Sequence, residues 1–222
     1  MIVETEIKGH KAIQHKLLLN EGLFHAHFLK NTKLEDIEEI VGLPVNRCWQ
    51  KHTDIVEEAP FDGTADGLYT QKANMLLTNR HADCQVAIFW DPKTKLLAGV
   101  HAGWRGQVSQ IYTKTVHKLK AKGAKPENIL VGISPSLGAC HGEFKGWQEY
   151  FPNSYEPFQV KENYFDLKAI AKDELEKAGI HPRHISIAPQ CTFADEKRFH
   201  SYRRDKTEER LVTVCYCPAR LP

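Results

Sequence analysis

The sequence lacks the features that mark export, membrane insertion and repetitive structure. Its first residues, MIVETEIKGHKAIQHKLLL, contain neither the apolar core nor the small-residue cleavage site of a signal peptide. No apolar run approaches the roughly 18 residues that are needed to cross a membrane. Repeats, low-complexity tracts and linkers rich in proline or glycine are also missing. We therefore expect a cytoplasmic protein without a membrane partner, folded as a single domain over residues 1–222.

The sequence also lacks a strong excess of charge of either sign. Thirty lysines and arginines against 28 acidic residues leave a formal net charge of +2, which is too small to indicate a nucleic-acid partner. Hydrophobic residues make up 41% of the chain, which is enough for a sizeable core. The composition is that of an ordinary globular protein.

Cysteine and histidine, by contrast, are plentiful. Because the cytosol keeps thiols reduced, the six cysteines are better candidates for metal binding or catalysis than for disulfides. Twelve histidines in 222 residues is a high count, and histidine is a common metal ligand. We nevertheless expect most of these histidines to be solvated surface residues.

The pattern of apolar residues predicts an α+β fold with mixed β-sheets and flanking helices. Residues 86–90 and 96–100 are predicted to pair as a hairpin, because the turn signal at 91–95 separates them. Further strands are predicted at 129–133, 184–188 and 211–215, with helices at 107–122, ended by Gly123, and at 166–178, with Asp166 as N-cap and Gly179 as stop.

The segment His101-Ala-Gly-Trp-Arg-Gly106 follows a predicted strand and carries residues with chemical uses. Gly103 and Gly106 free the backbone where the strand turns toward a helix, and the N–H groups of a helix start can bind an anion. Arg105 adds a planar cation that suits phosphate or carboxylate. The plainer interpretation is a glycine-rich turn around a packed Trp104.

Cys84 stands at the entrance of the first strand of the predicted hairpin. If the two strands pair, Cys84 lies beside His101 despite the 17 positions between them. A thiolate and an imidazole so placed can be two metal ligands, or a nucleophile and its base. A lone buried cysteine would act as a small apolar residue instead. A third candidate, His52, lies in a polar loop, where histidine is usually solvated.

The last third of the chain carries a basic and aromatic cluster, Lys197-Arg-Phe-His-Ser-Tyr-Arg-Arg204. Its guanidinium groups and aromatic rings suit a ligand that joins a phosphate to a base, although a basic surface loop is the plainer interpretation. The loop 134–140, which ends at Cys140, follows a predicted strand and is either the rim of a site or an ordinary turn.

These segments together resemble the laccase-domain family, also described as YfiH-like, multicopper polyphenol oxidase-like and purine nucleoside phosphorylase-like. The matching pieces run in family order across most of the chain. They are QKHTDIV, GTADGLYT, ADCQVAIF, GVHAGWRG, GISPSLGACHGEF, YFDLKAI, CTF and FHSYRRD. The order ADC, then HAGWRG, then SYRRD makes the resemblance specific.

The resemblance implies a YfiH-like α+β fold, similar to a bacterial cytotoxic deamidase domain of the cytotoxic-necrotizing-factor type. It also implies a zinc site on His52, Cys84 and His101, with copper as a second metal to consider. Three protein ligands and an open fourth position are typical of catalytic zinc. The implied activities are phosphorolysis of adenosine, inosine and methylthioadenosine, and deamination of adenosine. The expected partners are therefore a nucleoside and phosphate.

The resemblance also assigns expected roles to single residues. Cys84, His101 and Arg105 would be catalytic, and Glu143 is a candidate general acid or base for deamination. The residues expected to contact the substrate are Lys30, Arg105, Cys140, Arg203 and Arg204.

Part of the expected substrate rim departs from the family pattern, whereas the metal triad is kept. The departures are Lys30 for an arginine followed by a glycine stretch, Lys51-His52-Thr53 for Val-His-Gly, Cys140-His141 for a cysteine pair, and Glu209-Arg210 for Gly-Arg.

Three other functions stay open. A metal-free cysteine hydrolase, or a peptidoglycan-editing factor, would use Cys84 as nucleophile and His101 as base. A copper-dependent polyphenol oxidase would need a weak axial ligand and several histidine pairs, and the sequence has only two methionines. A nucleoside-binding protein without activity would keep the zinc as a structural ion.

Overall fold

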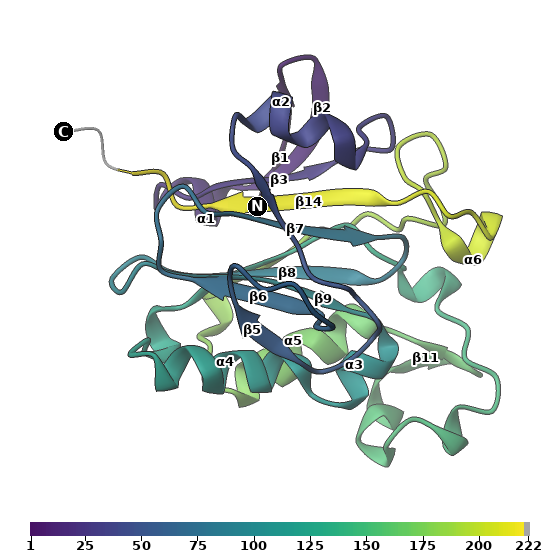
Figure 1. Cartoon of the computed structure of the whole chain (residues 1–222). Helices are drawn as coiled ribbons and strands as arrows, with labels where there is room; N and C mark the ends of the chain where they lie inside the picture. The colour runs from purple at the N-terminus through teal and green to yellow at the C-terminus, as the bar shows by residue number, and fades with distance from the viewer. Residues whose placement is uncertain (220–222) are drawn as a thin grey trace.

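Two six-stranded sheets dominate the computed structural model, which describes residues 1–219 (Figure 1). Of the predicted domain 1–222, residues 220–222 thus lie outside the described residues. The first sheet runs β1 (Ile2–Ile7), β2 (His10–His15), β3 (Phe24–Phe28), β14 (Leu211–Tyr216), β7 (Leu76–His81) and β4 (Val45–Asn46). The second sheet runs β13 (Ile185–Ile187), β10 (Leu130–Ile133), β8 (Gln85–Asp91), β9 (Leu96–Ala102), β6 (Gly67–Thr70) and β5 (Val56–Glu58).

Both sheets mix parallel and antiparallel pairs, and helices cover their outer faces, so the predicted α+β fold with mixed sheets is confirmed. The α-helices are α1 (Lys16–Leu19), α2 (Ile37–Val41), α3 (Trp104–Val108), α4 (Ile111–Ala121), α5 (Leu167–Lys177) and α6 (Tyr202–Asp205). Short 3₁₀ turns are η1 (Leu34–Asp36), η2 (Pro126–Asn128), η3 (Ala139–His141), η4 (Trp147–Glu149), η5 (Asn153–Phe158) and η6 (Pro182–His184), and β11 (Gln159–Lys161) pairs with β12 (Tyr164–Phe165). Within residues 1–219 no helix is both long and apolar enough to span a bilayer.

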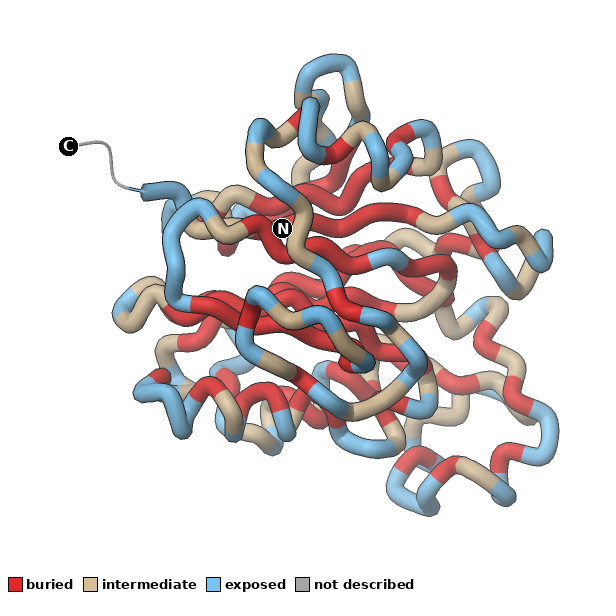
Figure 2. The backbone as a smooth tube through the Cα atoms, viewed as in Figure 1, coloured by how far each residue is buried: buried red, intermediate tan, exposed pale blue. Residues whose placement is uncertain are grey.

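The strand β8 lies in the middle of the core and has both faces covered (Figure 2). Its alternating side chains face opposite ways, as strand geometry requires. Ala87 and Phe89 pack in the cluster that includes α4 and α5, whereas Ile88 and Trp90 pack in the cluster between the two sheets. Because both faces of β8 are buried, its residues 86–90 form an uninterrupted apolar run.

The predicted helix at 107–122 is wrong at its start, because the segment holds two helices. α3 ends at Val108, and α4 begins at Ile111. Gln110 between them has a left-handed backbone conformation with φ of 58°, which breaks the helical hydrogen-bond series. The predicted helix at 166–178 is confirmed, since the Asp166 carboxylate accepts hydrogen bonds from the N–H groups of Lys168 and Ala169, each at 3.0 Å.

The expectation that most histidines are solvated is wrong, because five of the twelve are buried and four more are half-buried. Four of these five, His15, His25, His27 and His81, come together between the sheets, where hydrogen bonds engage their ring nitrogens. His15 Nε2 lies 3.1 Å from His27 Nε2, and His27 Nδ1 lies 2.9 Å from the hydroxyl of Thr213. The Thr213 hydroxyl also lies 3.1 Å from His81 Nε2, and His81 Nδ1 lies 3.1 Å from the carbonyl oxygen of Cys84.

Burial lowers the pKa of these histidines, so they stay neutral where a solvated histidine would protonate. The pKa of His15 and of His81 falls to about 3 and that of His25 to about 4, and the pKa of His27 also lies well below its usual value. Burial raises the pKa of Glu174 to about 7, so around pH 6 the folded chain binds a proton there that the unfolded chain does not.

We predict that the free energy of unfolding falls steeply between pH 6.5 and pH 5. In that range the unfolded chain takes up protons on four histidines that the folded chain leaves neutral, at about 1.4 kcal/mol per pH unit each. Glu174 offsets about one proton, so the net loss approaches about 4 kcal/mol per pH unit toward pH 5. Urea unfolding at several pH values measures this slope.

The matched control for this slope is His117→Gln, which replaces an exposed histidine of α4 and should leave it unchanged. A free energy of unfolding that stays constant from pH 7 to pH 5 would contradict the prediction.

Candidate metal centre

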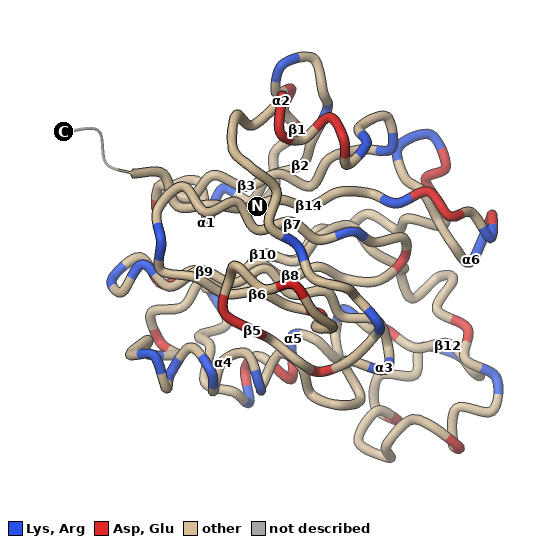
Figure 3. The backbone as a smooth tube through the Cα atoms, viewed as in Figure 1, with Lys and Arg blue, Asp and Glu red and all other residues tan. Residues whose placement is uncertain are grey.

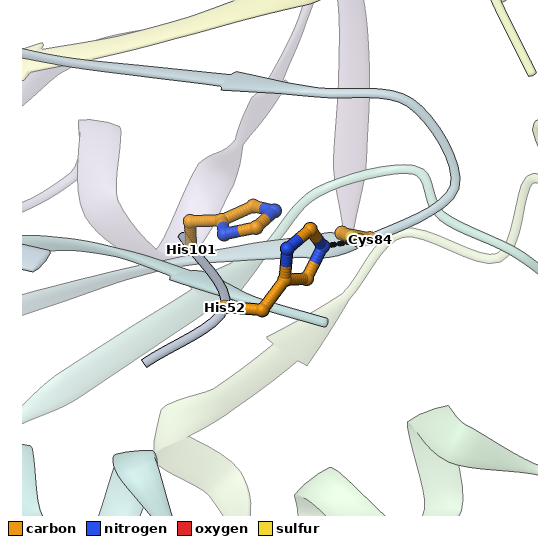
Figure 4. A group of neighbouring side chains, drawn as sticks. All are labelled: His52, Cys84 and His101. Carbon is orange, nitrogen blue, oxygen red and sulfur yellow. Dashed lines mark hydrogen bonds between the residues drawn. The ribbon is translucent and has the colours of Figure 1, made fainter. Parts of the chain in front are cut away.

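Cys84 and His101 are neighbours because β8 and β9 pair as the predicted antiparallel hairpin. Val86 is opposite His101 in the register, and Cys84 directly precedes β8. The side chains of His52, Cys84 and His101 converge in Figure 4, and their ligand atoms all lie within 4.8 Å of one another. The prediction that the hairpin brings Cys84 to His101 is therefore confirmed.

His52 reaches the other two residues from the loop between β4 and β5. Its backbone has a positive φ of 59°, which is uncommon for a residue with a side chain. Its Nε2 atom lies 3.6 Å from Cys84 Sγ, and its ring centroid lies 5.1 Å from that of His101. The strained loop conformation thus turns a histidine that looked solvated in the sequence toward the thiol.

Asp66 hydrogen-bonds to both histidines, although no sequence pattern singled it out. Its side chain is fully buried and accepts a hydrogen bond of 2.8 Å from His101 Nδ1. It also accepts hydrogen bonds from the N–H groups of Lys51, His52 and Thr53 and from the hydroxyl of Thr53. Because Nδ1 of His101 is taken, its Nε2 is the nitrogen left for a ligand.

The hydrogen bonds to Asp66 and the pairing of Cys84 with His101 fix the charges of the site. Burial alone would raise the pKa of Asp66, but the hydrogen bonds from His101 and Thr53 lower it to about 2. Burial would also raise the pKa of the Cys84 thiol, but His101 and His52 lower it to about 6. Despite burial, Cys84 and Asp66 raise the pKa of His101 to about 9. The thiol is therefore a thiolate near neutral pH.

Gly103 follows His101 at the start of α3, and its lack of a side chain makes room for the site. A Cβ atom there would overlap the ring of His52 and would lie 3.2 Å from Cys84 Sγ. The backbone φ of −74° is ordinary, so space rather than strain explains the glycine. This requirement accounts for the first glycine of the HAGWRG segment.

The three residues open into a cavity of about 700 Å³. Its wall combines cations with aromatic rings, which come from α3, α6 and the segment after α6, from β7, and from the loops after β4 and η3. Figure 3 marks lysine and arginine positions near α3 and α6, among others that are spread over the backbone. The cationic residues of the wall are Arg47, Arg80, Arg105, Arg203, Lys206 and Arg210, and the aromatic ones are Trp49, Trp104, Phe144 and Tyr202.

Three of these cations lie close enough together to repel one another. Burial, and then the charges of Arg210 and Arg47, lower the pKa of Arg80. The side-chain amide of Gln50 holds Arg80 through two hydrogen bonds of 2.8 Å to its backbone, which ties β7 to the loop that carries His52. Arg210 has a partial counterion in Glu208 at 3.6 Å, and Glu208 is 93% exposed. Such a cluster suits a bound anion.

Asp83, next to Cys84 in the chain, holds the part of the cavity rim that carries Arg203. Its carboxylate accepts hydrogen bonds from the hydroxyls of Thr192 (2.7 Å) and Ser201 (3.0 Å) and from the backbone N–H of Arg203 (2.7 Å). The guanidinium of Arg203 donates to the carbonyl oxygens of His141 and Glu143 and lies over the ring of Phe144. Part of its hydrogen-bonding capacity is thus used by the protein.

Of the predicted substrate contacts, Arg105 and Arg203 line the cavity, whereas Lys30, Cys140 and Arg204 do not. The ammonium of Lys30 donates to the carbonyl oxygen of Glu196 at 2.8 Å. The guanidinium of Arg204 is used by three carbonyl oxygens and by the carboxylate of Asp205.

Glu143, the candidate general acid or base, is also outside the cavity wall, and its carboxylate lies 3.7 Å from Lys145. Sequence reasoning missed Asp66, Arg47, Arg80 and the anionic rim residue Asp83. Asp66 stands in the matched segment GTADGLYT and Asp83 in ADCQVAIF, which was the signal available for these two, whereas Arg47 and Arg80 lie outside the matched segments.

The sequence of the chain is similar to those of known proteins. Residues 29–217 match the family described as multi-copper polyphenol oxidoreductase laccase. A purine nucleoside phosphorylase of Haemophilus influenzae is 29% identical over 193 residues, which is 80% of this chain and 77% of that protein. A purine nucleoside phosphorylase of Aquifex aeolicus is 32% identical over 183 residues, which is 79% of this chain and 82% of that protein.

The crystal structure of YlmD from Geobacillus stearothermophilus has the same fold. The TM-score is 0.85 at 22% sequence identity, and the match covers 97% of this chain and 98% of that chain. This likeness confirms the fold that the sequence resemblance implied.

Proposed function

The chain belongs to the multi-copper polyphenol oxidoreductase laccase family, and we propose that it cleaves purine nucleosides by phosphorolysis with a metal ion on His52, Cys84 and His101. The observation that carries the proposal is the cavity itself. It places a metal-ligand triad beside a cluster of guanidinium groups and several aromatic rings. These are the groups that a nucleoside and a phosphate together require.

The donor atoms of the triad fit zinc. Two imidazole nitrogens and one thiolate are preferred zinc ligands, and three ligands leave one position open toward the cavity. Asp66 adds the carboxylate–histidine contact that is usual around bound zinc. A zinc ion bound there would act as a Lewis acid on an oxygen or nitrogen of the substrate. We also propose a cytosolic setting, where the thiol of Cys84 stays reduced.

Copper chemistry of the polyphenol oxidase type has less support from the side chains. The histidines that could form a copper cluster, the four between the sheets, have their ring nitrogens engaged in hydrogen bonds. Those partners are Ser186, Thr213, Leu23 O, Cys84 O, His15 N and one another. Zinc is therefore the metal that we assign to the triad.

The arginines supply what phosphorolysis needs from the protein. A phosphate oxygen forms a bond to the ribose C1′ while the bond from C1′ to the purine nitrogen breaks, and the purine keeps the electron pair and takes up a proton. Arg47, Arg80 and Arg210 would hold the phosphate dianion, and Arg105 faces the cavity beside the triad. Trp104 and Tyr202 offer ring faces for the purine, whereas Arg203 lies over the ring of Phe144.

Deamination of adenosine, the second activity that the resemblance implied, needs a carboxylate near the metal ligands. Among the described residues of the cavity wall, the carboxylates are Asp83 and Glu208. Asp83 is used by three hydrogen bonds, and Glu208 is 93% exposed. Asp66 is bound to His101. Phosphorolysis of adenosine, inosine or methylthioadenosine is therefore the activity that we propose.

A metal-free thiol hydrolase, including a peptidoglycan-editing activity, is the alternative that one observation favours. The Cys84 thiol has a pKa of about 6 and lies beside His101, as in a nucleophile and base pair. Such a dyad needs no metal, so a chelator separates the two functions.

We predict that the purified protein converts adenosine to adenine and ribose 1-phosphate only when phosphate is present. Cys84→Ser should lower kcat/KM by at least about 100-fold, because the triad loses its thiolate. Chromatographic product analysis with and without phosphate and a strong chelator measures this. Cys217→Ser, which changes a half-buried cysteine far from the triad in sequence, is the control and should keep full activity.

Other product patterns would point elsewhere. Inosine formed without phosphate would indicate deamination. Full turnover by Cys84→Ser, or by chelated enzyme that has lost its metal, would refute the metal-dependent mechanism.

The arginine cluster gives a second prediction. Arg80→Gln should raise the KM for phosphate about tenfold or more, because a charge-assisted hydrogen bond contributes about 1.5–3 kcal/mol. The KM for the nucleoside at saturating phosphate should change less than about threefold. Arg183→Gln, which removes an exposed cation in η6, is the matched control. An unchanged phosphate KM in Arg80→Gln would remove Arg80 from the phosphate site.

A further inference from the structure

A second group of metal-ligand side chains lies outside the catalytic cavity. Cys140 and His141 stand at the end of η3, in the loop that follows β10, and Cys191 stands in the loop that follows β13. The parallel pairing of β10 with β13 and the bridge between Ser136 and Cys191 bring the two loops together. The ligand atoms of the three residues lie within 4.8 Å of one another, and none of the three lines the cavity of the triad.

We propose that Cys140, His141 and Cys191 form a second binding site for a zinc-type metal ion, which ties these two loops together. The donor set of two thiols and one imidazole belongs to the ligands that zinc prefers. This assignment also gives Cys140 a role other than substrate contact.

The distances match a metal-binding geometry before any ion is added. In a tetrahedral zinc site with usual bond lengths, neighbouring sulfur and nitrogen ligands are about 3.5 Å apart and two sulfurs about 3.8 Å apart. Nδ1 of His141 lies 3.1 Å from Cys140 Sγ and 3.8 Å from Cys191 Sγ. One nitrogen thus faces both sulfurs, so that small side-chain shifts would complete a shared site.

The surroundings hold the three ligands in place. The ring of His141 stacks on Phe193 with centroids 4.1 Å apart and an interplanar angle of 18°. The backbone N–H of Gly138 donates to Cys191 Sγ at 3.2 Å, a contact that is typical around metal-bound thiolates. A Cβ atom on Gly138 would lie 3.3 Å from both sulfurs, so a glycine leaves the ligands their space.

A positive charge lies near the two sulfurs as well. The ammonium of Lys168 donates to the carbonyl oxygens of Ala188 and Gln190, at 2.8 and 2.7 Å, and interacts electrostatically with both cysteines. A cation near a cysteine favours the thiolate, which is the form that binds a metal ion. Cys191 also lines a shallow cavity of about 440 Å³, through which an ion and a solvent ligand can enter.

The second site would act on the catalytic rim through short connections. Thr192, next to Cys191, donates to Asp83, which is next to Cys84. The carbonyl oxygen of His141 accepts a hydrogen bond of 2.9 Å from Arg203, which lines the catalytic cavity. A metal ion on the two loops would therefore hold the partners of Arg203 at fixed positions without touching the substrate.

The test is the metal content of the whole protein, kept reduced with a phosphine and loaded with Zn²⁺ or Co²⁺. We expect two ions per chain in the wild type, one in Cys84→Ser, one in Cys191→Ser and none in the double variant. Cys217→Ser, the matched cysteine control, should keep two. Co²⁺ bound to Cys84→Ser should show thiolate charge-transfer absorption from two sulfurs, and Cys191→Ser should show that from one.

Thermal unfolding adds a second readout, because a variant could lose its metal ion for reasons other than the missing ligand. Zn²⁺ should raise the midpoint of Cys84→Ser but not that of Cys84→Ser/Cys191→Ser, because only the former keeps a site that binds the folded state. One ion per wild-type chain, or an unchanged ion count in Cys191→Ser, would overturn the proposal. So would a Cys140–Cys191 disulfide that persists in the reductant while no second ion binds. None of these readouts involves nucleoside turnover.

Discussion

The hydrogen bonds around the buried carboxylate of Asp66 are the constraint on which the rest of the site depends. A carboxylate without water stays ionised only if donors replace the solvent, and here they come from the His101 ring and from residues 51–53. Each group that donates a hydrogen bond to Asp66 is thereby held in a fixed position. The loop bearing His52 and the orientation of the His101 ring both follow from this one group, and these two histidines lower the pKa of Cys84.

The site is also continuous with the polar interior of the fold. The hydrogen-bonded histidines between the sheets run from Ser186 on β13, through His15, His27 and Thr213, to His81 and the carbonyl oxygen of Cys84. Gly132 on β10 gives His15 its space, since a Cβ atom there would lie 2.7 Å from the His15 ring. The position of the Cys84 backbone is therefore set both by the hairpin and by a neutral histidine chain that crosses the core.

Features that depend on local pattern could be predicted from the sequence, and features that depend on distant partners could not. The hairpin of β8 and β9 followed from two apolar runs around a turn, and it located Cys84 beside His101. His52 came only from family resemblance, because its loop is held by Asp66, 14 positions away. The buried histidines and the arginine cluster were missed for the same reason, since their partners come from different strands and loops of the chain.

Asp66→Asn shows whether Asp66 organises a metal centre at the triad. An asparagine keeps the size of the side chain but loses the charge and one acceptor position. Measured by competition with a chromophoric chelator, its zinc affinity at the triad should fall about 10- to 100-fold, with Cys191→Ser as background and Asp173→Asn on α5 as control. Phosphorolysis should fall in parallel and recover when excess zinc is supplied. Unchanged zinc affinity and unchanged turnover in Asp66→Asn would show that Asp66 does not organise a metal centre.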